Sequence, residues 1–298
     1  MRLSINILKE PADFVAECKK KEAELELNGL FHTEENENSM ENAEPVTAEY
    51  EYIKKGFKNS LKHFFYLNCV RIYSHLINKN LTNLKVVKNK NAKKIKGAIV
   101  TCNHISLVDS FAIRKAIGAD FHYVAAEFNN FKGHLGTLAR NSGYIPLPEG
   151  LDKTKLRKFN EAISYYLNKG KKVLIFPEQA MWRDYTKPRP MKNGAFRYAV
   201  TNNVPILPLF ITIKEKEQKV DENGLQNFGD YTIHVLDPIY PKSELNAKEN
   251  IEYLRKENYR VWKELYEKTY GIPLEYTTLD KSKIEIYYCH PELNRRIP

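Results

Sequence analysis

The chain has 298 residues, of which 42% are hydrophobic and 28% charged, a composition typical of a globular protein and not of a disordered one. Its formal net charge of +10 favours an anionic partner, such as nucleic acid, anionic lipid or a phosphorylated substrate. The four cysteines lie far apart, with no C-x-x-C pair, which argues against a disulfide framework and against a structural zinc site.

Charge divides the first third of the chain sharply. Residues 1–51 contain thirteen Asp and Glu against five Lys and Arg, whereas residues 52–97 contain twelve Lys and Arg and no acid. Within the acidic part, HTEENENSMENAEP (32–45) is polar and poor in apolar residues, which predicts a linker or a mobile loop. We therefore expect residues 1–49 to form an acidic N-terminal extension with a linker, in which residues 1–31 hold a short strand and a helix.

The basic part predicts an amphipathic helical region over residues 50–83. Apolar residues recur there at steps of about three and four, and lysines fall mostly between them. The apolar positions are Ile53, Phe57, Leu61, Phe64, Phe65, Ile72 and Leu76. Such a helix can lie in a membrane interface, or its apolar face can pack on its own domain.

No stretch of the sequence predicts a membrane-spanning helix or a signal peptide. No window of eighteen residues is apolar and free of charge, and the opening MRLSINILKEPADF carries charges too early for a signal sequence. We therefore expect a cytoplasmic protein whose membrane contact is peripheral, on the inner face of the membrane.

From residue 84 onward, short β-rich runs alternate with helical stretches. The runs are LKVV (84–87), GAIVTC (97–102), FHYVAA (121–126), YIPL (144–147), KKVLIF (171–176), VPILPLFITI (204–213) and YTIHVL (231–236). Helices are expected near 106–117, 131–141, 152–169, 192–202 and 244–269. Apolar strands that alternate with helices predict an α/β domain over 84–270, with a largely parallel central sheet flanked by helices. Residues 271–298 are expected to be a C-terminal extension, whose run KIEIYY predicts an edge strand.

Two polar clusters directly follow two of the predicted strands. NHISLVD (103–109) follows GAIVTC, and PEQ (177–179) follows KKVLIF. Since ligands of open α/β sheets bind beyond the carboxyl ends of the strands, we expect both clusters on the same rim. A histidine acts as a general base when a carboxylate holds one ring nitrogen and the other faces the reacting proton. A bend between strand and helix would bring His104 and Asp109 together in this way.

A second interpretation of the same stretch is structural. Ser106 and Asp109 have the serine-x-x-acid spacing that opens many helices, and there Asp109 would only bond a free backbone N–H. Cys102 lies close to His104 in the sequence, which also leaves a Cys-His pair open.

The stretch FPEQAMWRDYTKPRPMKNGAFRYAV (176–200) combines a carboxylate at a strand end with four cations. The carboxylate is that of Glu178, and the cations are Arg183, Lys187, Arg189 and Lys192. Cations beside this rim suit a phosphate group, which arginine binds at two points. The alternative is a solvated basic loop before a helix.

Several other site classes lack their signatures. The sequence has no G-x-S-x-G nucleophile elbow, no P-loop, no G-x-G-x-x-G after a strand and no H-E-x-x-H zinc spacing. We therefore expect no metal and no tightly bound cofactor.

Four blocks resemble the glycerophospholipid acyltransferase family, which includes the 1-acylglycerol-3-phosphate acyltransferases. NHISLVD resembles the family's His-x4-Asp motif, and SGYIPL (142–147) resembles its second block. IFPEQ (175–179) and VPILPL (204–209) resemble the third and fourth blocks. They occur in family order and cover about residues 84–240, which implies a glycerol-phosphate-acyltransferase-like fold.

The resemblance implies acyl transfer from a thioester, acyl-CoA or acyl carrier protein, to a hydroxyl of a lysophospholipid. The favoured acceptor is 1-acylglycerol 3-phosphate, which gives phosphatidic acid, with glycerol 3-phosphate or another lysolipid as the alternative. By the family motif, His104 is the general base, Asp109 orients it, and Asn103 and Glu178 contribute to acceptor binding. An anionic membrane surface is the expected further partner.

The third block departs from the family pattern. Gln179 stands where the family has glycine, and Met181 stands where it has arginine. The phosphate role therefore falls to Arg183, with Lys187, Arg189 and Lys192 as substitutes. Two functions of another class remain as alternatives: a nucleic-acid-binding protein that uses residues 52–97, and a non-catalytic lipid-binding protein. The predicted helix over residues 50–83 resembles no sequence-reading motif, so no nucleic acid is expected.

Overall fold

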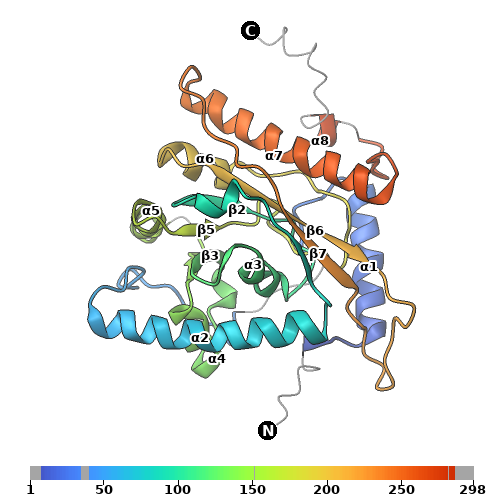
Figure 1. Ribbon diagram of the computed structural model, residues 1–298, viewed down its shortest axis with the longest axis horizontal. Helices are drawn as coiled ribbons and strands as arrows, with labels where there is room; N and C mark the ends of the chain where they lie inside the picture. The colour runs from blue at the N-terminus through green and yellow to red at the C-terminus, as the bar shows by residue number, and fades with distance from the viewer. Residues whose placement is uncertain (1–7, 35–39, 151, 281, 286–298) are drawn as a thin grey trace.

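Seven strands form one sheet at the centre of the protein, with helices on both of its faces (Figure 1). The computed structural model describes residues 8–34, 40–150, 152–280 and 282–285. The strands are β1 (Lys85–Val87), β2 (Ala98–Thr101), β3 (Phe121–Ala126), β4 (Tyr144–Leu147), β5 (Lys172–Leu174), β6 (Ile206–Lys214) and β7 (Asp230–Val235). Their order is β1-β7-β6-β2-β5-β3-β4, and every pair is parallel except β6–β7. The predicted α/β class with a largely parallel sheet is confirmed.

Helices lie between most of these strands, close to the expected positions. They are α1 (Ala12–Leu27), α2 (Phe57–Asn80), α3 (Asp109–Ile117), α4 (Gly133–Asn141), α5 (Lys153–Asn168), α6 (Gly194–Thr201), α7 (Ala247–Tyr270) and α8 (Ser282–Glu285). Two short 3-10 helices are η2 (Ala92–Lys94) and η3 (Glu127–Asn129). α7 starts with a capping box, in which Asn246 and Glu249 bond each other's backbone N–H, and ends at Gly271 in the left-handed conformation.

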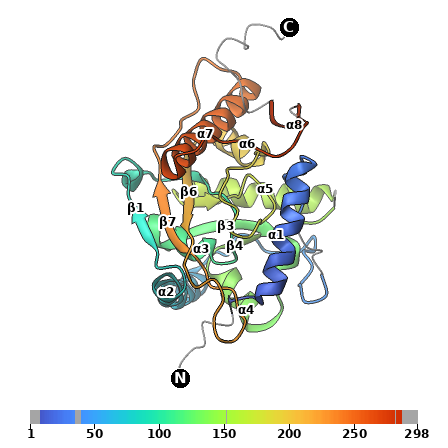
Figure 2. The same cartoon turned by 90° about the vertical axis from the view of Figure 1, so that its right-hand side faces the viewer.

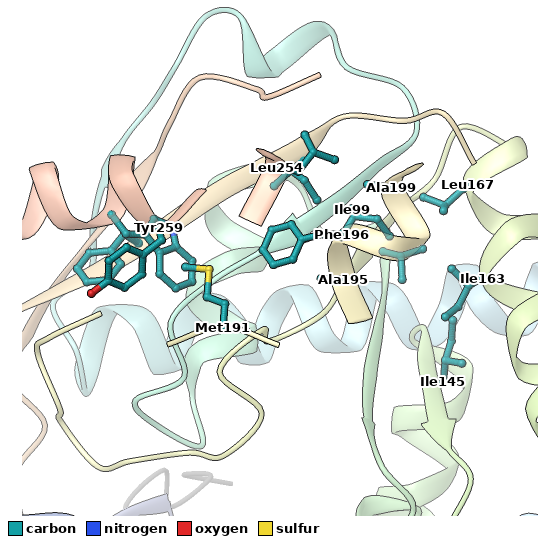
Figure 3. Packing of buried hydrophobic residues seen from close by; sticks show 14 of the residues in the cluster. Ile99, Ile145, Ile163, Leu167, Met191, Ala195, Phe196, Ala199, Leu254 and Tyr259 are labelled. Atoms are coloured by element: carbon teal, nitrogen blue, oxygen red, sulfur yellow. The ribbon is translucent and has the colours of Figure 1, made fainter. Parts of the chain in front are cut away.

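Apolar cores lie on the two faces of the sheet. On one face α5, α6 and α7 cover the central strands, with Phe196 and Leu254 fully buried (Figure 3). On the other face α2 and α3 cover the same strands, with Ile77 and Ile113 buried. Successive residues of β2 point alternately into the two cores, so the whole strand is buried and its first three residues are apolar.

α2 has one face in the core and another in solvent. Leu67, Val70 and Ile77 are buried where the helix packs on α3 and α4. Phe57 and Phe64, which the sequence assigns to the apolar side, are exposed by 85% and 62%. The packing interpretation is therefore confirmed for the buried residues. Aromatic side chains remain uncovered on the other face, and the membrane interpretation stays a prediction.

The N-terminal extension is folded onto the α/β domain. Figure 2 shows α1 lying in front of the sheet, on the side where β6 ends. The predicted linker is held to the domain in part. The backbone N–H of Glu44 donates to the carbonyl of Asn130, the side-chain amide of Asn130 donates to the carbonyl of Glu44, and Ala43 is buried. The expected strand falls mostly on residues 1–7, outside the described residues.

The edge strand predicted for KIEIYY is wrong for the part that the structure describes, because residues 282–285 form α8. The rest of that run lies outside the described residues. The boundaries proposed for the four regions of the chain stay predictions. No helix among the described residues combines the length and the apolar character that crossing a bilayer requires.

Candidate active site

The loops that follow β2 and β5 meet at the carboxyl ends of the parallel strands. The backbone N–H of Trp182 donates to the carbonyl of His104 at 3.1 Å, and that of Asp184 donates to Ile105 at 2.9 Å. These bonds join two segments that are far apart in the sequence. The two polar clusters therefore lie on one rim, as the strand order of an α/β sheet predicts.

His104 and Asp109 are in direct contact within the loop after β2. His104 Nδ1 lies 2.9 Å from Asp109 Oδ2, which also accepts the backbone N–H groups of Ile105 at 2.8 Å and Ser106 at 3.0 Å. Because that carboxylate oxygen is an acceptor for all three groups, Nδ1 carries the proton and donates it to the hydrogen bond. The other ring nitrogen, Nε2, is then an acceptor, as a general base must be.

The histidine ring is fixed on its flat side as well. It stacks on Phe176, with ring centroids 3.9 Å apart and 12° between the planes. The side chain of His104 remains 23% exposed, whereas that of Asp109 is only 1% exposed. The imidazole of His104 is therefore open to solvent, whereas the carboxylate of Asp109 is shielded from it.

The structural interpretation of Asp109 is correct in part. The carboxylate bonds two backbone N–H groups of its own loop, in addition to His104. Ser106 does not cap α3, which begins at Asp109. Its Oγ accepts the N–H of Val108, the residue directly before the helix, at 3.2 Å. Asp109 therefore shapes the loop and holds the histidine at the same time.

Cys102 does not form the alternative pair with the histidine. Its thiol is buried, and burial, followed by the nearby Asp109 and Glu178 carboxylates, raises its pKa well above the ordinary value. A neutral buried thiol is a poor nucleophile.

Asn103 is tied into the sheet. Its amide donates to the carbonyl of Ile211 at 2.9 Å and accepts the N–H of the same residue at 2.8 Å. Asn103 is fully buried, so these bonds anchor the loop after β2 to the neighbouring strand β6.

Glu178 and Arg189 form a buried ion pair beneath the rim. Arg189 Nη2 lies 2.9 Å from Glu178 Oε2, and both side chains are 1% exposed. Glu178 also accepts the backbone N–H groups of His104 at 3.1 Å and Arg189 at 2.8 Å. Arg189 donates further to the carbonyls of Phe31, His104 and Ala180. The pair thus fastens the two rim loops together, and its predicted part in acceptor binding stays a prediction.

Two other predicted acceptor cations are paired with acids of the N-terminal extension. Arg183 binds Glu10 through Nε and Nη2, each at 2.6 Å. Lys187 Nζ binds Glu26 Oε1 at 2.8 Å. Lys192 is exposed, and its backbone N–H donates to Pro177 at 2.8 Å.

The segment after α1 also contributes residues to the site that the sequence did not point to. Glu34 Oε2 accepts the backbone N–H of Met181 at 3.2 Å, and Trp182 Nε1 donates to the carbonyl of Thr33 at 2.9 Å. Burial raises the pKa of Glu34 and lowers that of His32 to about 4. The only signal in the sequence was the excess of acids in the extension, which matches the cations of residues 183–192.

A small pocket opens beside the histidine loop. It is lined by Ile105 and Leu107 from that loop, by Met181 and Arg183 from the loop after β5, and by Val15 of α1 among others. Among residues 8–34, 40–150, 152–280 and 282–285, no group of three or more His, Cys, Asp or Glu side chains is arranged to hold a metal ion.

Residues 83–212 match the family model named Acyltransferase. The chain is 28% identical over 162 residues to an uncharacterized acyltransferase of Schizosaccharomyces pombe, covering 52% of this chain and 56% of the relative. It is 26% identical over 207 residues to a 1-acyl-sn-glycerol-3-phosphate acyltransferase of Saccharomyces cerevisiae, covering 68% and 66%. It is 23% identical over 142 residues to the chloroplastic enzyme of that name from Brassica napus, covering 48% and 40%.

The fold is similar to that of a solved structure, the 1-acyl-sn-glycerophosphate acyltransferase PlsC of Thermotoga maritima. The TM-score is 0.54 at 19% sequence identity, over 72% of this chain and 85% of that one. The sequence relatives are matched over about two fifths to two thirds of their own length.

Proposed function

We propose that this chain, whose residues 83–212 match the Acyltransferase family model, transfers a fatty acyl group from an acyl thioester to a hydroxyl of a lysophospholipid. The observation that carries the proposal is the 2.9 Å contact between His104 Nδ1 and Asp109 Oδ2, on a rim where ligands of α/β sheets bind. Both residues lie within the matched range. Such a pair activates a hydroxyl without a covalent acyl-enzyme.

The geometry supports the following step. The acceptor O–H gives its proton to His104 Nε2 as its oxygen attacks the thioester carbonyl carbon. The tetrahedral intermediate then expels the thiolate, which takes the proton back from the imidazolium, so an ester and a free thiol are released. Asp109 keeps the proton on Nδ1 and stabilises the imidazolium while it exists. General-base help of this kind is worth about 10²–10⁴-fold in rate.

The favoured acceptor is 1-acylglycerol 3-phosphate, which would give phosphatidic acid. Two relatives carry that activity in their names, and the rim is next to Arg183, Lys187 and Lys192, which suit a phosphate. Glycerol 3-phosphate or another lysolipid is the alternative acceptor. The donor is acyl-CoA or acyl carrier protein, with no tightly bound cofactor.

A bilayer is the natural source of such an acceptor, and α2 offers a surface for it. Phe57, Leu61, Phe64 and Phe65 are exposed along this helix beside exposed lysines such as Lys62. Aromatic side chains and lysines on one exposed helix are typical of proteins that lie on anionic lipid surfaces. We therefore propose peripheral binding to an anionic membrane, on its inner, cytoplasmic face.

The chemistry is tested with variants of the pair in detergent-dispersed acceptor, so that membrane binding does not enter. His104→Ala and Asp109→Asn should each lower thioester consumption by about 10²–10⁴-fold. His75→Ala, an exposed histidine of α2, is the matched control and should retain full activity. Thermal unfolding establishes that each variant is folded.

A folded Asp109→Asn protein with unchanged activity would restrict Asp109 to its role in the loop. No thioester consumption by the wild-type protein with lysophospholipids or glycerol 3-phosphate would favour a non-catalytic lipid-binding protein. A gel shift with a steep salt dependence would favour nucleic acid instead.

A further inference from the structure

Gln179 lies in a turn whose other residues contact the proposed base. Phe176 stacks on the ring of His104, and Glu178 accepts the backbone N–H of His104 at 3.1 Å. The backbone N–H of Gln179 donates to the carbonyl of Phe176 at 3.2 Å, which closes the turn at the carboxyl end of β5. Gln179 is therefore part of the same rim as the histidine.

The backbone of Gln179 is left-handed, with a φ of 70°. Across it, the N–H of Ala180 donates to the carbonyl of Glu178 at 3.0 Å. A hydrogen bond between residues two apart, around a residue of positive φ, indicates the rare and strained form of the γ-turn. The family has glycine at this position, and glycine adopts a positive φ without that strain. The chain thus keeps a side chain where the backbone disfavours one, which is typical of functional sites.

The side chain of Gln179 is exposed to solvent, so packing does not explain its presence. Within residues 8–34, 40–150, 152–280 and 282–285, its amide takes part in no hydrogen bond. A primary amide has two N–H donors and one oxygen acceptor. All of these groups are therefore available to a ligand at the rim.

Two cations of the same loop are already engaged with acids. Arg183 donates to Glu10 through Nε and Nη2, and Lys187 Nζ donates to Glu26. A phosphate that binds either cation must share it with a carboxylate. The amide of Gln179 can bond a phosphate without the release of another group.

We propose that Gln179 is a specificity-determining residue, whose side-chain N–H donates to a phosphate oxygen of the acceptor. This inference rests on the proposed function, because it takes a phosphate-bearing lysophospholipid as the acceptor. It also accounts for both departures of the third block from the family pattern. Met181, at the family's arginine position, has no side-chain donor, and Gln179 supplies one two residues earlier in the same loop.

The first test detects the contact without turnover. The side-chain amide protons of Gln179 are assigned in nuclear magnetic resonance spectra by their loss in Gln179→Gly. Saturating short-chain lysophosphatidic acid, added without donor, should shift these signals downfield. Monoacylglycerol with the same acyl chain and no phosphate should leave them in place. Unmoved signals with lysophosphatidic acid, or equal shifts with both lipids, would overturn the proposal.

The second test compares the acceptor KM of two variants with that of the wild type. Gln179→Gly removes the amide, suits the φ of 70°, and should raise the KM for lysophosphatidic acid about tenfold, the value of a hydrogen bond to a charged group. Gln179→Glu keeps the shape but replaces the donors with a negative charge, so it should raise this KM further. The value of kcat, the KM for the thioester and the rate with monoacylglycerol should not change, since the amide does not bind the reacting groups.

Asn203→Gly is the matched control. Asn203 is also exposed and has a φ of 49°, but it precedes β6 and so lies at the opposite edge of the sheet from the rim. The substitution puts glycine at a left-handed position in the same way and should leave every kinetic value at the wild-type level. Thermal unfolding establishes that all three variants are folded.

These outcomes separate the inference from the proposed function. An active wild-type protein whose acceptor KM is unchanged or lowered in Gln179→Gly, or unchanged in Gln179→Glu, would contradict a donated hydrogen bond. Equal effects of Gln179→Gly and Asn203→Gly would assign the change to the backbone and not to the amide, which also contradicts the proposal. A wild-type protein that consumes no thioester would overturn the proposed function, and the first test alone would then decide the inference.

Discussion

Glu178 shows how one carboxylate can hold the loop that carries His104 in place. Its two oxygens accept from the N–H of His104, the N–H of Arg189 and the guanidinium of Arg189. All of these groups are shielded from water, where a charge without its partner is costly. The position of His104 therefore depends on a residue that does not touch its ring.

We expect Arg189→Met to destabilise the protein by about 3–5 kcal/mol, because it leaves the Glu178 carboxylate buried without its cation. Urea unfolding measures the change in the free energy of unfolding. Arg197→Met is the matched control, since Arg197 is exposed on α6 and should change stability by less than about 0.5 kcal/mol. Equal effects of the two substitutions would contradict a dominant role for the buried pair.

The sequence predicted the contacts that lie close together along the chain. His104 and Asp109 are five positions apart, so one strand-to-helix bend brings them into contact. Arg183 and Glu10 are 173 positions apart, and no local pattern indicates such a pairing. The cations of the loop after β5 stand out in the sequence, and their part in acceptor binding stays a prediction. The acids that bind two of them came into view only with the fold.

At the scale of elements, α2 shows that the spacing of apolar residues predicts a helix but not which of its faces is buried. The predicted apolar positions Phe57, Leu61 and Phe64 are exposed, while Leu67 and Val70, on another side of the helix, are buried. A helix with apolar residues on more than one side does not reveal which side faces the core. Only packing on α3 and α4 decides it.

We expect Phe64→Glu/Phe65→Glu to reduce sedimentation with liposomes that contain anionic lipid by at least several-fold. The change replaces two apolar side chains, exposed by 62% and 61%, with charges that the lipid repels. The matched control is Tyr240→Glu/Ile272→Glu, which alters two other exposed apolar residues. Raising the salt concentration should weaken binding of the wild-type protein, because lysines contribute.

If Phe64→Glu/Phe65→Glu pellets as well as the wild type, α2 is not the lipid-binding surface. If the control variant loses binding to the same extent, the loss reflects net charge and not a particular face.

The sequence predicted where the strands lie better than it predicted which neighbouring strands run parallel or antiparallel. Each of the seven β-rich runs contains a strand, because strands buried on both faces are apolar without alternation. The antiparallel β6–β7 pair was not specified, since its connection, residues 215–229, has no helical pattern to settle the direction. The KIEIYY run alternates like a strand, yet its first residues belong to α8.

At the scale of the whole molecule, the acidic extension and the basic rim belong to one electrostatic unit. The chain carries a net charge of +10, but its first 51 residues contain thirteen acids and five bases. Folding brings two of these acids, Glu10 and Glu26, onto cations of the loop after β5. The family match was predictable from four short blocks, whereas the position of the extension depends on contacts made by the complete fold.

Glu22 makes the docking of α1 on the rim sensitive to pH. Burial raises the pKa of this carboxyl from 4.5 to about 8, against the opposing effects of the Arg183 N–H and of the Arg189, Lys19 and Arg183 cations. The docked state therefore holds a proton that the undocked helix releases. Docking is favoured at low pH and weakens as the pH rises toward 8, by about a factor of ten per pH unit.

We expect trypsin to cleave α1 after Lys19, Lys20 or Lys21 faster as the pH rises from 7 to 8, because a protease cuts a helix only where it opens, and α1 opens more readily once it leaves the rim. Glu22→Gln has no titrating group at this position and corrects for the pH dependence of trypsin itself. The ratio of wild-type to Glu22→Gln cleavage rates should therefore increase with pH. Glu17→Gln, which changes an exposed acid of the same helix, should follow the wild type. A ratio that stays constant across this range would show that Glu22 does not couple protonation to docking.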